Sequence, residues 1–252
     1  MPDPLTPVPP DALRQGITLD AATVTLAGRL VLDRVSLTLT EQRIGILGRN
    51  GSGKTTLLRL IAGLIAPGSG TVRVDGVDPY TDRKATLRAL GILFQNPDHQ
   101  ILFPTVEEEL AFGLVQQGQS QSAATARAHQ ALAAEGWVHW AKAPVSTLSQ
   151  GQRHYLCLLS VLLMQPRTIL LDEPLAGLDL PTQTRLARRF AALPQRLVTI
   201  THDPATVAGA DRVLWLEAGR IVADGPPATV IPGFTAEMAR IGERDADVDL
   251  TG

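Results

Sequence analysis

Two segments near the start of the chain alternate apolar and polar residues: 17–26 (ITLDAATVTL) and 30–39 (LVLDRVSLTL). A period of two places the apolar side chains on one face of a strand, which predicts two half-solvated antiparallel strands. Short apolar runs, each followed by helix-like sequence, occur at 43–48 (RIGILG), 91–95 (GILFQ), 168–172 (TILLD) and 197–201 (LVTIT). Such runs are typical of parallel strands that are covered on both faces.

The middle of the chain has a different pattern. Strand signals fade from about residue 97 to 164, where 105–117 (TVEEELAFGLVQQ) and 122–136 (SAATARAHQALAAEG) show helical spacing and helix-forming residues. The sequence therefore predicts an α/β domain over 17–235, with an antiparallel β subdomain and an inserted α-helical subdomain.

The two ends of the chain are expected to lie outside this domain. Residues 1–16 carry prolines where a signal peptide needs a basic and an apolar segment, so we expect a disordered leader on a cytoplasmic protein. Residues 236–252 are predicted to form a polar, frayed tail. No apolar run approaches the ~20 residues of a spanning helix, so we expect the chain not to cross a bilayer.

Composition narrows the classes of function. The chain has 252 residues, of which 44% are hydrophobic and 19% charged, as in globular proteins with a substantial core. Lys+Arg number 23 and Asp+Glu 25, and the formal net charge of -2 gives no global field that would draw the chain onto nucleic acid. Cys157, the single cysteine, lies in an apolar run and is predicted to be a buried, inert thiol.

A glycine-rich motif follows the first short apolar run. GRNGSGKTT, residues 48–56, fits G-x-x-x-x-G-K-[ST], with a strand pattern before it and a helix pattern after it. The glycines let consecutive N–H groups point at phosphate oxygens. Lys54 would place its positive charge against the β and γ phosphates, and the Thr55 hydroxyl would bind Mg²⁺. A simple turn before a helix is the alternative, which the flanking elements disfavour. The predicted phosphate-binding residues are Gly48, Asn50, Gly51, Ser52, Gly53, Lys54, Thr55 and Thr56.

Two other apolar runs end in chemically active side chains. In TILLDEP, the apolar run ends in two adjacent acids. Asp172 is predicted to hold Mg²⁺, and Glu173 to accept a proton from a water that attacks phosphate. In LVTITHD, the apolar run ends at His202, on the same predicted sheet edge. Because ligands of open α/β sheets gather at that edge, these residues are predicted to form one site, although an acidic turn and a surface histidine are the alternatives.

LSQGQR, residues 148–153, permits two interpretations. Ser149 and Gln152 are three residues apart, as in a capping box at a helix start. The same helix start, with Gly151 in its first turn, also leaves N–H groups and the positive end of a helix dipole available for a phosphate. The motif by itself leaves both interpretations open.

These motifs, in this order and at these spacings, resemble those of the ATP-binding subunit of an ABC transporter: the glycine-rich loop, Gln95 after GILF, LSQGQ, LLDEP, AGLD and His202. The resemblance covers nearly the whole chain after the leader. It implies a RecA-like P-loop NTPase core that binds ATP with Mg²⁺. It further implies that Gln95 senses Mg²⁺ and water, that Asp179 lies in the D-loop, and that His202 positions the γ-phosphate.

The resemblance also implies a dimer. In this family the helix start at LSQGQ, called the signature, binds the γ-phosphate of ATP held by the other subunit, so Ser149, Gly151 and Gln152 would act across a head-to-tail dimer. One loop and one signature per chain then make a single copy incomplete, and the second ATPase subunit is either identical or different. Two positions depart from the family: Gln150 replaces a glycine, and Leu26 stands where an aromatic stacks on adenine.

FQNPDHQILFPTVEEELAFG, residues 94–113, resembles the corresponding stretch of energy-coupling-factor (ECF) importers. The resemblance implies uptake of a vitamin such as biotin, or of cobalt or nickel ions. It also implies an integral membrane coupling protein that docks beside this stretch near Gln100, a substrate-binding membrane subunit, and a peripheral position on the cytoplasmic face of the inner membrane. No nucleic-acid partner is expected.

Two rival classes fit the sequence less well. ABC-type ATPases that act on chromosomes insert long coiled coils between loop and signature, for which this chain has no room, and ribosomal ones carry two modules in one chain. A P-loop kinase or GTPase would have neither the signature nor the strand that ends at His202.

Overall fold

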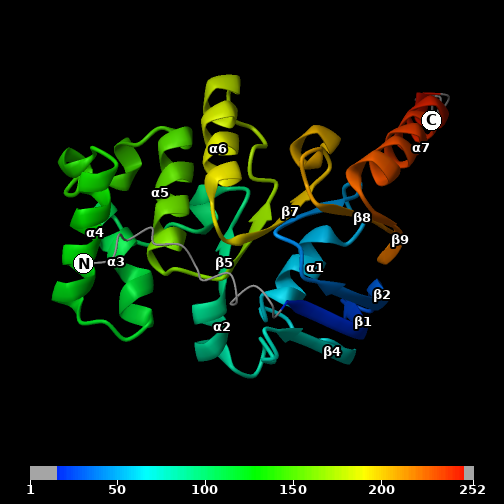
Figure 1. The fold of residues 1–252 in the computed structure, drawn as a ribbon, viewed down its shortest axis with the longest axis horizontal. Helices are drawn as coiled ribbons and strands as arrows, with labels where there is room; N and C mark the ends of the chain where they lie inside the picture. The colour runs from blue at the N-terminus through cyan, green and yellow to red at the C-terminus, as the bar shows by residue number, and fades with distance from the viewer. Residues whose placement is uncertain (1–15, 247–252) are drawn as a thin grey trace.

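The computed structural model describes residues 16–246. Residues 1–15 and 247–252 lie outside this range, and with them nearly all of the expected leader and the end of the expected tail. The described chain forms two β-sheets with helices around them (Figure 1). The predicted α/β class, with its antiparallel β sheet, is confirmed.

The smaller sheet is antiparallel, in the order β2-β1-β4. Its strands are β1 (Ile17–Leu26), β2 (Arg29–Leu39) and β4 (Ser69–Val74). β1 and β2 cover the two alternating segments, and alternate apolar residues such as Leu19 and Leu37 are buried. The antiparallel pair predicted from that alternation is therefore confirmed.

The larger sheet has the order β5-β6-β7-β3-β8-β9, in which only β9 runs antiparallel to its neighbour. Its strands are β3 (Arg43–Leu47), β5 (Leu90–Leu93), β6 (Thr168–Asp172), β7 (Arg196–Thr201), β8 (Arg212–Glu217) and β9 (Arg220–Gly225). The four short apolar runs form β3, β5, β6 and β7, so their parallel arrangement is confirmed.

Both faces of the larger sheet are covered. On one face, Ile44 and Ile46 join a core shared with the smaller sheet and with helix α1 (Lys54–Ile61). On the other face, Leu171 packs with residues of α5 (Gln150–Leu163) and α6 (Leu180–Ala192). In Figure 1, α1 and α6 accordingly lie on opposite sides of β7. Burial on both faces explains why these strands are continuously apolar.

The helices of the middle segment enclose a core of their own. α3 (Val106–Gln116), α4 (Gln121–Ala134) and one side of α5 share a cluster that includes Leu110, Leu132 and Leu159. These helices lie at the left of Figure 1, away from the smaller sheet. α2 (Arg83–Ala89) precedes β5 and was not predicted.

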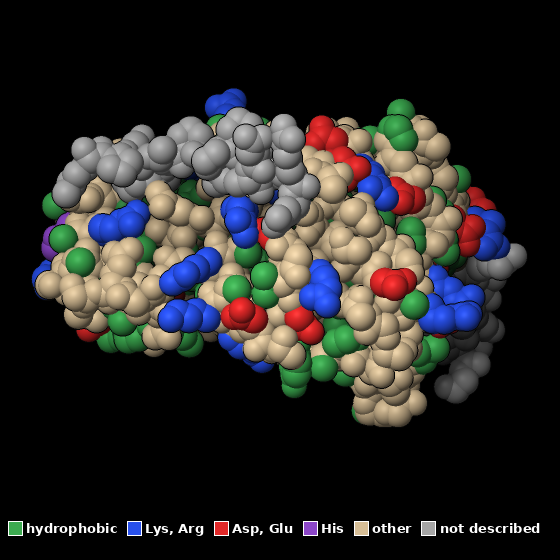
Figure 2. Space-filling model, turned by 60° about the horizontal axis from the view of Figure 1, so that its bottom comes forward, with side chains coloured by type: hydrophobic (Ala, Val, Ile, Leu, Met, Phe, Trp, Pro, Cys, Tyr) green, Lys and Arg blue, Asp and Glu red, His purple; other side chains and the backbone are tan. Residues whose placement is uncertain are grey.

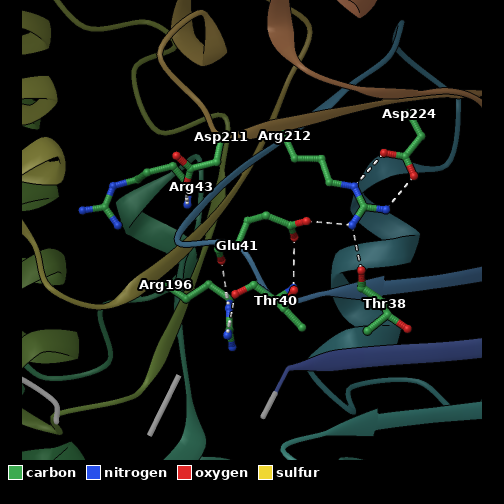
Figure 3. A network of polar contacts seen from close by, with 8 residues as sticks. All are labelled: Thr38, Thr40, Glu41, Arg43, Arg196, Asp211, Arg212 and Asp224. Carbon is green, nitrogen blue, oxygen red and sulfur yellow. Dashed lines mark hydrogen bonds and ion pairs between the residues drawn. The ribbon is translucent and has the colours of Figure 1, made fainter. Parts of the chain in front are cut away.

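Three arginines lie at the amino ends of the core strands, at the edge opposite the glycine-rich loop (Figure 3). Arg196 of β7 is fully buried and donates to the carbonyl oxygens of Glu41 (3.0 Å) and Thr40 (3.1 Å). Arg212 of β8 donates to the carbonyl oxygen of Thr38 (2.9 Å) and to the Glu41 carboxylate (3.0 Å). These bonds fasten the end of β2 to the core sheet.

The third arginine, Arg43 of β3, joins the sheet to a helix. Its guanidinium donates to the carbonyl oxygens of Ala191 (3.3 Å) and Leu193 at the end of α6 and of Gln195 (2.7 Å). A cation at the carboxyl end of a helix satisfies free carbonyls and complements the helix dipole. α6 is thereby held at both ends, because Asp179 caps its start by accepting from the N–H of Thr182 (2.9 Å).

Residues 236–246, expected to be frayed, are helical instead. These residues belong to α7, Pro227–Ala246, which lies against β8 and β9. Val230 and Phe234, four residues apart, are buried, and Phe234 meets Trp215 edge to face with centroids 5.6 Å apart. An apolar stripe with helical spacing therefore anchors the segment, although Pro232 lies inside it.

The surface shows mixed charges. On the face drawn in Figure 2, basic and acidic side chains are interspersed, in keeping with the nearly balanced composition. Among residues 16–246, no helix combines the length and apolar character that crossing a membrane requires.

Candidate functional site

The glycine-rich loop, residues 48–53, connects β3 to α1 and is called the P-loop below. Gly51 and Gly53 have φ values of 81° and 106°, in the left-handed region that favours glycine. A Cβ atom on Gly48 would lie 2.4 Å from the carbonyl oxygen of Leu216. The glycines of the motif are thus required by the shape of the turn.

Lys54, the first residue of α1, lies over this turn. Its side chain is buried, and its Nζ donates to the carbonyl oxygens of Gly48 (2.6 Å) and Arg49 (3.0 Å). Burial lowers the pKa of Lys54, while the nearby charges of Glu173 and Asp172 act in the opposite direction. The loop therefore presents a cation within reach of two acids.

A cavity of about 270 Å³ opens over the P-loop. It brings together residues from the P-loop, the end of β5 and the end of β6. Its lining residues are Val31, Asn50, Gly51, Gly53, Lys54, Thr55, Thr56, Gln95, Asp172 and Glu173. Sequence reasoning missed Val31, because only the packing of β2 against the P-loop places it there. That packing is close: a Cβ atom on Gly53 would lie 3.1 Å from the carbonyl oxygen of Val31.

Glu173 is held from two sides by residues at the end of β7. Its Oε1 lies 2.8 Å from Nδ1 of His202, and its Oε2 accepts from the Thr201 hydroxyl at 2.9 Å. The backbone of Glu173 is left-handed (φ 47°), a conformation that costs a non-glycine residue about 1–3 kcal/mol. The structure thus brings the two predicted residues together and adds Thr201, which the sequence did not single out.

Asp172 ends β6 beside the P-loop. Its carboxylate is buried, and burial raises its pKa above the ordinary value, with the charge of Glu173 adding to the rise and that of Lys54 opposing it. A buried acid of this kind is stabilised as an anion by a nearby cation.

The signature forms the capping box predicted for it. The Ser149 hydroxyl accepts from the N–H of Gln152 (3.3 Å), and the Gln152 side chain accepts from the N–H of Ser149 (2.7 Å). Seven of the predicted site residues are not among the described residues that line the P-loop cavity: Gly48, Ser52, Ser149, Gly151, Gln152, Asp179 and His202. Gln150 instead lines a neighbouring hollow of about 440 Å³, which shares Gln95 with that cavity.

Gly151 has a packing role within the chain. A Cβ atom there would lie 2.9 Å from Cγ2 and 3.2 Å from Oγ1 of Thr182, near the start of α6. The starts of α5 and α6 therefore approach so closely that a side chain at position 151 would displace Thr182.

The segment expected to dock a membrane partner is held rigidly from within. The Gln100 side chain points inward: its Oε1 accepts from the N–H of Phe94 (3.2 Å), and its Nε2 donates to the carbonyl oxygen of Cys157 (3.4 Å). Buried Glu109 accepts from the N–H groups of Leu102 (2.8 Å) and Phe103 (3.0 Å). Leu102 is left 67% exposed at the surface of this segment.

The predicted burial of Cys157 is confirmed.

A parallel sheet with a glycine-rich turn of this sequence after β3 and acids at the end of β6 is typical of the class of P-loop nucleotide-binding proteins. Comparison with known proteins narrows this class. The sequence profile of the ABC transporter family matches residues 32–176.

Relatives agree with this match. The chain is 51% identical, over 92% of its length and 99% of the relative, to the biotin transport ATP-binding protein BioM of Rhodobacter capsulatus. It is 35% identical, over 80% of its length and 74% of the relative, to the energy-coupling factor transporter ATP-binding protein EcfA1 of Ligilactobacillus salivarius. The solved structure of cbiO1 from Clostridium perfringens, part of the ABC transporter complex cbiONQ, has a TM-score of 0.73 and 26% identity, and the match covers 92% of this chain and 99% of that one.

The chain therefore belongs to the ABC transporter family, as an ATP-hydrolysing subunit of the energy-coupling-factor type.

The close approach at Gly151 yields a stability prediction. Gly151→Ala should lower the free energy of unfolding by about 1–3 kcal/mol, the range typical of overpacking, because the new methyl group meets Thr182. Thr182→Ala removes both close atoms. Gly151→Ala should therefore cost much less stability in the Thr182→Ala background than in the parent. Urea denaturation of the four proteins measures this coupling. Equal losses from Gly151→Ala in both backgrounds would contradict the packing role.

Proposed function

We propose that two ATPase subunits, this chain and an identical or homologous partner, hydrolyse Mg²⁺-ATP at sites shared across a head-to-tail dimer, and that hydrolysis drives an ECF-type importer. The observation that carries the proposal is the single cavity over the P-loop that gathers Lys54, Gln95, Asp172 and Glu173. Biotin is the first cargo to test, because the 51% identical relative is named for biotin transport. Cobalt and nickel ions are the other cargoes of this class.

The P-loop is proposed to bind the phosphates. Its N–H groups and Lys54 would neutralise the β and γ phosphate oxygens. Thr55, Gln95 and Asp172 line the same cavity and offer hydroxyl, amide and carboxylate oxygens, the hard donors that suit Mg²⁺. Bound there, Mg²⁺ would neutralise charge on the phosphate oxygens.

Glu173 is proposed as the general base. Its carboxylate lies in the P-loop cavity, where it can accept the proton of a water that attacks the γ-phosphate. His202 contacts Glu173 through Nδ1, and its side chain is 54% exposed; its other ring nitrogen is proposed to contact the γ-phosphate. Gln95 at the end of β5 would orient the water and the metal ion.

The signature is proposed to complete the site of the partner subunit. Ser149 and Gln150, at the start of the capped helix, are exposed. Ser149, Gly151 and Gln152 would therefore meet the γ-phosphate held by the partner's P-loop, with Asp179 beside them at the start of α6. The cap and the phosphate site are in this proposal two uses of one helix end.

The membrane partner is proposed to dock on residues 97–112. Leu102 is exposed there, and the half-buried rings of Phe103 and Phe112, both in this segment, lie 5.1 Å apart. Glu109 fixes the backbone of the loop, so the surface is preformed. An integral membrane coupling protein would bind here and join the ATPase, at the cytoplasmic face of the membrane, to the substrate-binding subunit.

Substituting the proposed base tests the chemistry. Glu173→Gln keeps the shape of the side chain and removes its basicity, so ATP turnover should fall by at least the ~10²-fold typical of general-base loss, while ATP still binds. A phosphate-release assay and a nucleotide-binding titration measure the two effects. Glu237→Gln, at an exposed ion pair on α7, is the control and should retain full turnover. Parental turnover in Glu173→Gln would refute the assignment.

Substituting the exposed leucine tests the docking surface. Leu102→Asp should reduce cargo uptake by about tenfold or more, as expected when an apolar group at the centre of an interface becomes charged. ATP hydrolysis by the purified subunit should not change, because Leu102 is outside the P-loop cavity. Uptake of labelled biotin by cells that carry the whole importer is the measurement. Val222→Asp, at an equally apolar and 52% exposed position on β9, is the matched control. Equal uptake in both variants would argue against this surface.

A further inference from the structure

We infer that Thr201, the last residue of β7, is a positioning residue that holds the Glu173 carboxylate in place for its reaction with water. This inference rests on the proposed role of Glu173 as the general base. It assigns a function to a buried hydroxyl that no motif of the sequence singles out.

The hydroxyl of Thr201 accepts one hydrogen bond and donates its proton to the Glu173 carboxylate. The N–H of Asp203 donates to Oγ1 of Thr201 at 3.0 Å, and Oγ1 donates to Oε2 of Glu173 at 2.9 Å. A hydroxyl has one proton, so once an N–H occupies a lone pair, that proton is directed at the carboxylate. Thr201 is 2% exposed, so water does not replace this bond. These two consecutive hydrogen bonds, from Asp203 to Thr201 and from Thr201 to Glu173, therefore fix Oε2 of the Glu173 carboxylate.

The backbone of Glu173 is fixed to the same strand. Its N–H donates to the carbonyl oxygen of Ile200 at 2.8 Å, while its φ of 47° is one that a glutamate seldom adopts. β7 thus holds Glu173 by its main chain at Ile200 and by its side chain at Thr201. Strained residues persist where their surroundings hold them, and here the end of β7 does so.

Thr201 differs from His202 in how it contacts the carboxylate. The His202 side chain is more than half exposed and is proposed to face the γ-phosphate, whereas Thr201 approaches Glu173 from inside the protein. Lys54 and Asp172 interact electrostatically with Glu173, but neither has a hydrogen bond to its carboxylate among the described contacts. Thr201 is therefore the buried contact that sets the direction of the carboxylate.

A purely structural role is the alternative, since the Asp203–Thr201 bond also shapes the turn after β7. Three variants separate the two roles. Thr201→Val keeps the shape and loses the hydroxyl, Thr201→Ala loses it with less bulk, and Thr201→Ser keeps it. Thr199→Val, two residues earlier on β7 and facing an apolar cavity, is the matched control.

The expected result is a loss in kcat alone. Thr201→Val and Thr201→Ala should lower kcat for ATP roughly 10- to 100-fold, the range for loss of a hydrogen bond to a charged group, with the KM for ATP within about twofold of the parent. Thr201→Ser should recover most of the rate, and Thr199→Val should match the parent. Binding of a fluorescent ATP analogue and the melting temperature show that the variants are folded and bind nucleotide.

A double-mutant cycle with Glu173→Gln identifies the route of the effect. If Thr201 acts through the carboxylate, Thr201→Val should cause no further loss of single-turnover rate in the Glu173→Gln background. An equal loss in both backgrounds, or a parental kcat in both Thr201→Val and Thr201→Ala, would overturn the inference and leave the role of Glu173 standing. Parental turnover in Glu173→Gln would instead overturn the proposed role of Glu173, and the inference with it.

Discussion

The order of four parallel strands is the constraint on which the site depends. β5, β6, β7 and β3 are neighbours in the core sheet and end at one edge, and neighbouring strands lie about 4.8 Å apart. Gln95 follows β5, Asp172 ends β6, Thr201 ends β7 and the P-loop follows β3. Groups that are more than one hundred residues apart in the chain thus lie side by side at one cavity.

The opposite edge of the sheet keeps this arrangement in register. Arg196 and Arg212 bind the end of β2, and Arg43 binds the end of α6, whose other end is capped by Asp179. α6 in turn abuts the signature helix through Thr182 and Gly151. The P-loop and the signature are therefore connected through one frame, but Ser149, Gly151 and Gln152 are not among the described residues that line the chain's own cavity. In the proposed dimer, the signature of a second subunit would complete that site.

Local patterns predicted those features that depend on neighbouring residues. The apolar runs, the glycines of the P-loop and the Ser149–Gln152 cap are each determined within a few residues, and the sequence predicted them. The Thr201–Glu173 bond joins residues 28 positions apart, and only the packing of β6 beside β7 creates it. α7 was missed because Pro232 lies within it and a proline usually ends a helix. The contact of Phe234 with Trp215, which helps to hold this helix, joins residues distant in the sequence.

The central claim is that each site is built from the P-loop of one subunit and the signature of the other. Mixing a Lys54→Ala chain with a Ser149→Asp chain tests it most directly, because Asp still caps α5 but places a negative charge against the γ-phosphate. In a mixed dimer, one shared site then carries both lesions and the other carries neither. The account predicts that verified mixed dimers recover ATPase activity that neither parent variant has. Mixed dimers as inactive as the two parent variants would contradict it.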